Sequence, residues 1–135
     1  MGFVYDLARQ SFLNGAINWT NDTIKAILVS NAYTPNAATH QYLSSIPAAQ
    51  RLSTSVALTA KTSAAGVAGA DNTIFPAVTA GNTGNAIVII KDTGTDTTSP
   101  LIAYIDSAAS GLPVTTNGGD VNCGWDTGAN RIFKL

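Results

Sequence analysis

The sequence predicts a mainly β protein: an antiparallel β-sandwich or a partly open barrel with one short N-terminal α-helix. Of the 135 residues, none is Glu and only 11% are charged, whereas Thr, Ala, Asn, Gly, Val and Ile are abundant. β-Branched residues fit the pleated surface of a sheet, and Asn and Gly supply tight turns. Short apolar or alternating runs also recur along the chain with turn signals between them. No composition shift marks a linker, so residues 1–135 are expected to form one domain.

The helical pattern is confined to the N-terminus. Apolar residues at helical spacing form one stripe there: Phe3, Val4, Leu7, Ala8 and Phe12. This stripe predicts a helix over about residues 3–14, and Asn14-Gly15 supplies its stop signal. Residues 39–46 are expected to hold one further helical turn, which Pro47 ends.

The rest of the chain is predicted to form strands and turns. The expected strands are 23–30, the alternating segment 52–58, the Gly-rich segment 64–69, and 73–75, 86–91, 101–105, 113–115, 121–125 and 131–134. Segment 23–30 is apolar on both faces near its end, which predicts a central strand. The two most apolar runs, 86–91 and 101–105, predict a long hairpin with a projecting polar loop at 92–100. The main core is expected to include Ile87, Ile89, Leu101, Ala103 and Ile105.

Charge and composition disfavour several classes of function. A formal net charge of −1 leaves no basic face for a run of phosphates, so nucleic-acid binding is not expected. No apolar run approaches the roughly 20 residues of a membrane span, and no signal peptide is recognisable. The lone Cys123 excludes an intramolecular disulfide, which favours synthesis in a cytoplasm. With one His and no Glu, the chain is poor in acid–base groups and is not expected to be an enzyme or to carry a cofactor.

The triplet Asp-Thr-Gly occurs twice, at Asp92 and at Asp126. Aspartic proteases pair two such triplets, because two carboxylates that share a proton activate water. Only residues 129–135 follow the second copy, which is too little chain for a protease lobe. Asp-x-Gly is also common turn chemistry, and a turn is the preferred interpretation.

Two metal-binding hypotheses are weaker still. Asp92, Thr93, Asp96 and Thr97 offer oxygens to calcium, which takes six to eight oxygen ligands, usually with several carboxylates. A solvated loop is the preferred interpretation. His40 and Cys123 cannot complete a zinc site without two carboxylates, so His40 is expected to bond within its turn and Cys123 to be buried on a strand.

Tryptophan residues and glycosylation sequons also bear on function. Trp19 and Trp125 are expected in the core or at an interface, and one of them would be exposed in a sugar-binding module. Asn18 and Asn21 each begin a glycosylation sequon, which is discounted because no export signal accompanies them.

Several segments resemble small virion proteins of tailed bacteriophages. Those chains often have D-T-I-K-x-x-L-V, a Tyr-Thr turn, and a His-x-Phe/Tyr-Leu-Ser-x-Ile segment. The matching segments here are 23–29, 33–35, 39–47, 90–94, 101–106, 112–114, 117–120, 125–126 and 132–135. Together they span most of the chain.

The resemblance implies a structural role in the virion without catalytic residues. The first expectation is a capsid decoration or cement protein that binds the major capsid protein at the capsid surface. A neck or tail component is the alternative, and a glycan- or receptor-binding module is a further one. A homo-oligomer, a trimer or a dimer, is expected. Loop 92–100 is the expected contact element, followed by the N-terminal helix.

Overall fold

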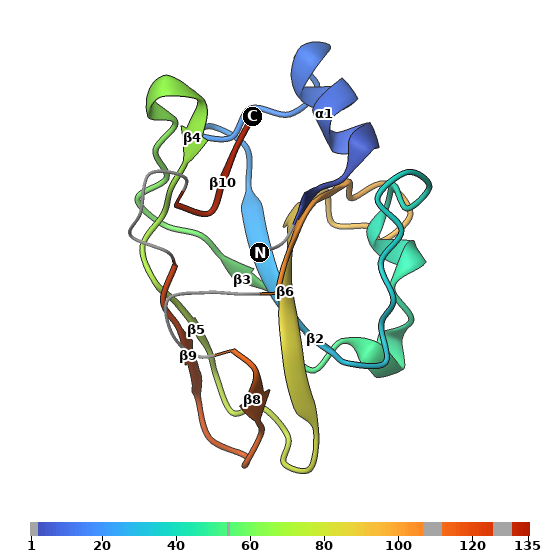
Figure 1. The fold of residues 1–135 in the computed structure, drawn as a ribbon, viewed down its shortest axis with the longest axis vertical. Coiled ribbons are helices and arrows are strands. Elements are labelled where there is room, and N and C mark those ends of the chain that lie inside the picture. The colour runs from blue at the N-terminus through green and yellow to red at the C-terminus, as the bar shows by residue number, and fades with distance from the viewer. Residues whose placement is uncertain (1–2, 54, 107–111, 126–130) are drawn as a thin grey trace.

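The computed structural model describes residues 3–53, 55–106, 112–125 and 131–135, and its architecture is the predicted mainly β, antiparallel, sandwich-like fold (Figure 1). The strands are β1 (Phe3–Val4), β2 (Ile24–Ser30), β3 (Val56–Ala57), β4 (Val67–Ala68), β5 (Thr73–Phe75), β6 (Thr83–Lys91), β7 (Leu101–Ile105), β8 (Val114–Thr115), β9 (Val121–Cys123) and β10 (Phe133–Lys134). The α-helix is α1 (Asp6–Leu13), and short 3₁₀ turns are η1 (Leu43–Ser45), η2 (Ala48–Gln50) and η3 (Ala64–Gly66).

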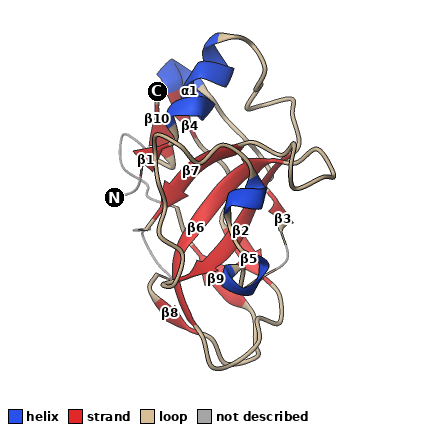
Figure 2. Cartoon of the chain, turned by 90° about the vertical axis from the view of Figure 1, so that its right-hand side faces the viewer, coloured by secondary structure: helices blue, strands red, loops and turns tan. Residues whose placement is uncertain are grey.

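A central sheet has the strand order β1-β7-β6-β2-β3, and β8 pairs with the N-terminal end of β6. Two small antiparallel pairs, β4–β10 and β5–β9, accompany it. The central sheet is open, with the two-residue strands β1 and β3 at its edges, so the partly open barrel describes it less well than a layered arrangement. Figures 1 and 2 show segment 31–51 on one side of this sheet, and the β5–β9 and β4–β10 pairs on the other.

Register explains why both faces of the central strands are apolar. Val88 lies opposite Tyr104, and Tyr104 contacts Tyr33 of segment 31–51, so this parity faces that segment. Ile87 and Ile89, which lie opposite Ile105 and Ala103, therefore face the small strand pairs. All five residues predicted for the main core are at most 5% exposed. The predicted hairpin of 86–91 with 101–105, and the central position of 23–30, are confirmed.

The N-terminal helix begins later than predicted. Phe3 and Val4 form β1 and pair with Tyr104 and Ala103 of β7, and the Phe3 ring stacks on Tyr104 at 5.5 Å. Tyr5 is still extended, so the helix begins at Asp6. The first two apolar residues of the stripe thus complete a sheet, because the edge of β7 offers them both hydrogen bonds and a ring to stack on.

Several predicted strands are shorter than expected, including 121–125, of which β9 forms three residues, and 131–134, of which β10 forms two. Among the described residues of segment 52–58, only Val56–Ala57 is a strand, because the Ser53 hydroxyl accepts the Leu28 N–H and interrupts the ladder. Segment 64–69 begins with η3, where Ala65 and Gly66 have positive φ. Val67–Ala68 then pairs with β10, and Gly69 forms an isolated bridge with Thr62. The turn expected within 39–46 is η1.

Candidate functional site

Loop 92–100 was expected to project, and the structure shows it exposed at its tip but fastened at several points. The Asp92 carboxylate accepts the Gly94 N–H at 2.9 Å, and Gly94 has φ of +88°, so this Asp-Thr-Gly triplet is the turn favoured above. Ser99 is buried and its hydroxyl donates to the Thr95 carbonyl at 2.8 Å. The Thr93 N–H in turn donates to the Ser99 hydroxyl. Residues 93–98 are exposed on this internally bonded loop.

Segment 43–51 attaches to the loop through hydrogen bonds and one ion pair. The N–H of Leu43 donates to the Ser99 carbonyl at 2.9 Å, and the N–H of Ser44 donates to the Asp96 carbonyl at 3.1 Å. Arg51 completes the attachment: its guanidinium donates to the carbonyls of Leu43 and Ile46 and forms an ion pair of 2.7 Å with Asp96. A single side chain therefore joins η1, η2 and the loop.

A network of lysine and aspartate side chains lies at the start of the hairpin loop, around Lys91 and Asp92. Lys25 pairs with Asp92 at 2.7 Å, and Lys91 pairs with Asp22 at 3.2 Å. Lys61 donates to the Asp22 carbonyl, and desolvation lowers the pKa of its ammonium. Both carboxylates of the proposed calcium loop, Asp92 and Asp96, are thus engaged by cations from elsewhere in the chain. Within the described ranges, no three His, Cys, Asp or Glu side chains gather closely enough to hold a metal ion.

We expect this network to make stability fall in acid. A hydrogen bond from the Asn18 N–H and the neighbouring Lys91 lower the pKa of Asp22, and Lys25 and the Gly94 N–H lower that of Asp92. A lowered carboxylate pKa stabilises the fold above the unfolded value of about 4, and this contribution disappears as pH falls through the folded values. Urea midpoints measured from pH 5 to pH 2 should therefore fall.

The matched variants separate this network from general acid denaturation. Asp22→Asn combined with Asp92→Asn should give a shallower fall below pH 4 than the wild type. The control is Asp71→Asn, a change at an exposed carboxylate that takes no part in these two ion pairs, which should keep the wild-type slope. Equal slopes in all three proteins would contradict the assignment.

His40 lies in the local network that the sequence predicted. Its Nδ1 accepts the Asn36 N–H at 3.3 Å and contacts the Tyr33 hydroxyl at 2.9 Å. A backbone N–H can only donate, so Nδ1 is an acceptor and Tyr33 must also donate to it. Tyr33 then accepts from the Tyr5 hydroxyl at 2.8 Å, and burial raises the pKa of both phenols. His40 thus orients a hydrogen-bonded chain that joins segment 31–51 to the N-terminal segment.

The remaining sequence candidates are structural as far as the structure describes them. Cys123 is 1% exposed, and burial raises the pKa of its thiol to about 11. Trp19 and Trp125 are 6% and 5% exposed, and their indole N–H groups donate to the carbonyls of Gly69 and Asp71. Asp126 lies outside the described residues. The arrangement of its carboxylate relative to that of Asp92, which the aspartic protease hypothesis concerns, is therefore also outside them.

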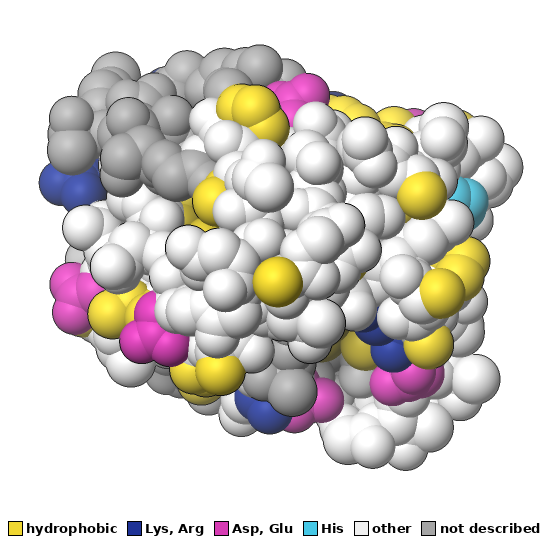
Figure 3. Space-filling model, turned by 90° about the horizontal axis from the view of Figure 1, so that it is seen from below, with side chains coloured by type: hydrophobic (Ala, Val, Ile, Leu, Met, Phe, Trp, Pro, Cys, Tyr) yellow, Lys and Arg dark blue, Asp and Glu magenta, His cyan; other side chains and the backbone are white. Residues whose placement is uncertain are grey.

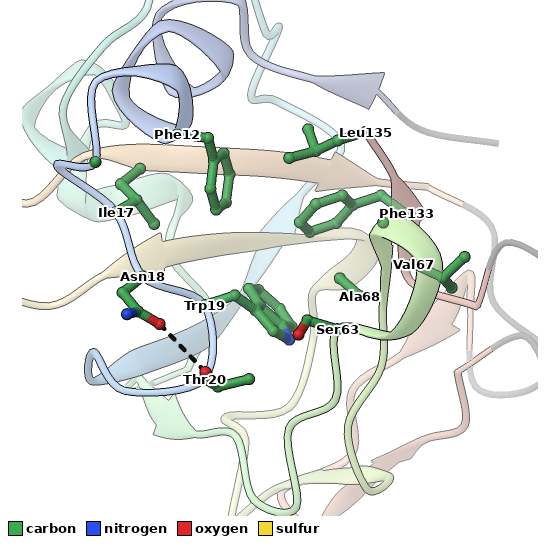
Figure 4. A pocket seen from close by; sticks show the side chains of 12 residues that line it. Phe12, Ile17, Asn18, Trp19, Thr20, Ser63, Val67, Ala68, Phe133 and Leu135 are labelled. Atoms are coloured by element: carbon green, nitrogen blue, oxygen red, sulfur yellow. Dashed lines mark hydrogen bonds between the residues drawn. The ribbon is translucent and has the colours of Figure 1, made fainter.

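An open pocket of about 280 Å³ lies between the end of α1, the following loop and the β4–β10 pair (Figure 4). Its lining residues are Phe12, Gly15, Ile17, Asn18, Trp19, Thr20, Ser63, Gly66, Val67, Ala68, Phe133 and Leu135. Figure 4 shows Phe12 and Phe133 above Trp19, with Asn18, Thr20 and Ser63 at the polar side. Trp19 meets Phe133 edge to face at 5.2 Å.

Sequence reasoning missed both this pocket and Arg51. The pocket draws its walls from residues 12–20, 63–68 and 133–135, which only the fold brings together. One signal was present in the sequence, because Leu13 is apolar yet lies outside the predicted helical stripe. No pattern in the sequence around Arg51 indicated its role in attaching the loop.

On the lower face, the described hydrophobic side chains are dispersed and are not gathered into one patch. Figure 3 shows hydrophobic side chains scattered singly over a surface that is mostly uncharged, with charged groups spread among them. Isolated exposed hydrophobic residues are normal on soluble domains. No helix within the described ranges has the length and apolar character needed to cross a bilayer.

The sequence matches no protein-family model, and a search of curated proteins likewise returns no match.

Proposed function

We propose that this chain is a non-enzymatic structural protein of a tailed-bacteriophage virion, most specifically a capsid decoration protein that binds the major capsid protein. The observation that carries the proposal is the fastening of loop 92–100, whose exposed tip is held by Arg51, Ser99 and Lys25. A contact element that is already ordered loses little conformational entropy when it docks. The resemblance of segments 23–29, 33–35, 39–47, 90–94 and 101–106 to small virion proteins supports the same role.

The surface chemistry also supports a binding role on a crowded lattice. The formal net charge is −1, and the exposed loop residues 93–98 are mostly Thr and Gly with one Asp. Small, weakly charged side chains allow close docking and limit repulsion between neighbouring copies. A glycan-binding module receives less support, because it was expected to expose Trp19 or Trp125 and both are buried.

The test uses heads produced by a phage from which the gene has been deleted. Purified protein should bind these heads with saturation and raise their resistance to heat and osmotic shock, because a ligand that binds the assembled state stabilises it by mass action. Particles from the deletion should be assembled but fragile. Heads that fail to join tails would replace the decoration role with the neck or tail role.

A loop variant tests the proposed contact element. Thr97→Arg adds bulk and charge to the exposed tip without removing a side chain that fastens the loop. It should weaken head binding by at least about tenfold, whereas Thr79→Arg, an exposed Thr outside the loop, should bind like the wild type. Equal binding by both variants would remove loop 92–100 from the contact surface.

A further inference from the structure

The hydrogen bonds around His40 fix where its ring carries a proton. Its Nδ1 meets two donors, the Asn36 N–H at 3.3 Å and the Tyr33 hydroxyl at 2.9 Å, so the ring is neutral with its proton on Nε2. Tyr33 accepts from the Tyr5 hydroxyl at 2.8 Å, and burial raises the pKa of both phenols, so that each keeps its proton. Every hydroxyl hydrogen in this series of bonds therefore has an acceptor.

Protonation of His40 removes that match. A hydrogen on Nδ1 leaves the Asn36 N–H without its acceptor and makes Tyr33 accept from the ring instead of donating to it. One hydroxyl hydrogen of Tyr5 and Tyr33 then has no acceptor, because in the described part of the chain these hydroxyls bond only each other and His40. The two tyrosines are 0% and 4% exposed, so water cannot supply the missing partner. The closed arrangement thus disfavours the charged imidazolium.

The surroundings of His40 supply no ion pair that offsets this loss. Residues 31–50 contain no Asp, Lys or Arg. They meet the N-terminal segment through a hydrogen bond from the Asp6 N–H, and they meet β7 through Tyr104, whose ring lies 6.1 Å from that of Tyr33. The charged and titratable side chains on these neighbours are Tyr5, Asp6, Arg9, Tyr104 and Asp106. Within the described ranges, His40 forms no ion pair with a carboxylate.

His40 also lies beside the attachment of loop 92–100. Gln41, the next residue, accepts the Leu101 N–H through its carbonyl at 2.8 Å, where the loop ends and β7 begins. The following residues continue this attachment through the bonds of segment 43–51 described above. A movement of the His40 ring out of its hydrogen bonds therefore acts on the chain that holds the base of the loop.

We propose that His40 is a pH-sensitive switch: its neutral ring attaches segment 31–42 to the N-terminal segment, and its protonation releases that segment and loosens the base of loop 92–100. The closed form binds one proton fewer at this ring than the open form, so acid favours opening. Histidine side chains change charge between about pH 5 and pH 8, above the range expected for Asp22 and Asp92. The inference deepens the proposed function, on which it rests only for the consequence at the capsid.

Hydrogen exchange on the purified protein measures the switch without heads. The Asp6 amide, which donates to the Ala37 carbonyl at 2.9 Å, and the Leu101 amide should each lose at least about tenfold in protection between pH 7.5 and pH 5.5. Protection is taken relative to the unfolded chain at the same pH, which removes the pH dependence of exchange itself. The amide of Ile89 in the central sheet should keep its protection. Constant protection of Asp6 or of Leu101 would overturn the proposal.

His40→Asn separates titration from a merely structural role. The amide oxygen of Asn can replace Nδ1 as the acceptor and takes up no proton in this range, so the variant should stay protected at both pH values. Thr39→Asn, a change at the exposed neighbouring position, should keep the wild-type pH dependence. If the Asp6 amide of His40→Asn still lost protection at pH 5.5, another group would be responsible and the switch would be refuted.

Nitrogen chemical shifts of the imidazole test the same switch in the unaltered protein. His40 is the one histidine of the chain, so these signals are assigned without ambiguity. At pH 7.5 they should show the neutral ring with its proton on Nε2, and the imidazolium should appear at the same midpoint as the loss of Asp6 protection. A proton on Nδ1 at pH 7.5, or two different midpoints, would contradict the proposal.

Head binding distinguishes a failure of the switch from a failure of the proposed function. On the same heads, the wild type should bind more weakly at pH 5.5 than at pH 7.5, whereas His40→Asn should bind equally at both. Head binding at pH 7.5 together with constant amide protection would overturn the switch and leave the capsid role in place. Absence of head binding at pH 7.5, together with protection that responds to pH, would overturn the capsid role alone.

Discussion

Leu101→Ala is expected to destabilise the protein by about 2–5 kcal/mol. Leu101 is 0% exposed at the start of β7, where it lies opposite Ile90 beside a register shift in β6. Removing its isobutyl group leaves a cavity inside the hairpin that carries the most apolar part of the core. The surrounding strands are paired on both sides and can collapse into that space only in part. Urea denaturation monitored by tryptophan fluorescence measures the loss.

Leu13→Ala is the matched control for this change. The same atoms are removed from a side chain that is 89% exposed, so the free energy of unfolding should change by less than about 0.5 kcal/mol. Measurements at low protein concentration keep self-association out of the comparison. A loss below about 1 kcal/mol for Leu101→Ala would mean that this position does not belong to the packed core.

Arg51→Ala should cost about 2–3 kcal/mol, although the residue lies outside the strands and helices. The ion pair with Asp96 contributes little by itself, because the Asp96 side chain is 57% exposed. The larger effect comes from the carbonyls of Leu43 and Ile46, which would lose their guanidinium donors. Ile46 is fully buried, so water cannot replace those donors without opening the segment.

Hydrogen exchange distinguishes this local role from a general loss of stability. The amide of Ser44 donates to Asp96 of the loop, so its protection should fall further in Arg51→Ala than that of Ile89 in the central sheet. Arg9→Ala removes an exposed arginine from α1 and should leave both amides protected. Unchanged protection of Ser44 in Arg51→Ala would show that the loop does not depend on this side chain.

The parts of the fold that could be predicted are those encoded by neighbouring residues. The hairpin of β6 and β7 follows from two apolar runs joined by one polar loop, and the turn at Asp92–Gly94 follows from its own three residues. The pairs β4–β10 and β5–β9 could not be predicted, because strands of two or three residues carry almost no pattern and their partners are distant in sequence.

The distinction between local and long-range interactions also explains which features of the candidate sites were not predicted from the sequence. Phe3 and Val4 match a helical stripe, and only the edge of β7 decides that they form a strand. Arg51 acts through carbonyl groups, which every residue has, so its partners leave no trace in the sequence. The loop 92–100 could be located from its composition, but its attachment to segment 43–51 depends on the tertiary fold.

The length of the two edge strands has a consequence for how such a chain avoids misassembly. The central strands β2 and β6 are long, apolar and low in charge, a composition typical of segments that stack into cross-β aggregates. Each is enclosed by neighbours, and the sheet ends in β1 and β3, which present only two residues apiece. Edge strands of two residues offer an incoming strand too few backbone N–H and C=O groups to extend the hydrogen-bonded ladder of the sheet. A protein with few charged residues to keep copies apart thus resists fibre formation through the geometry of its borders.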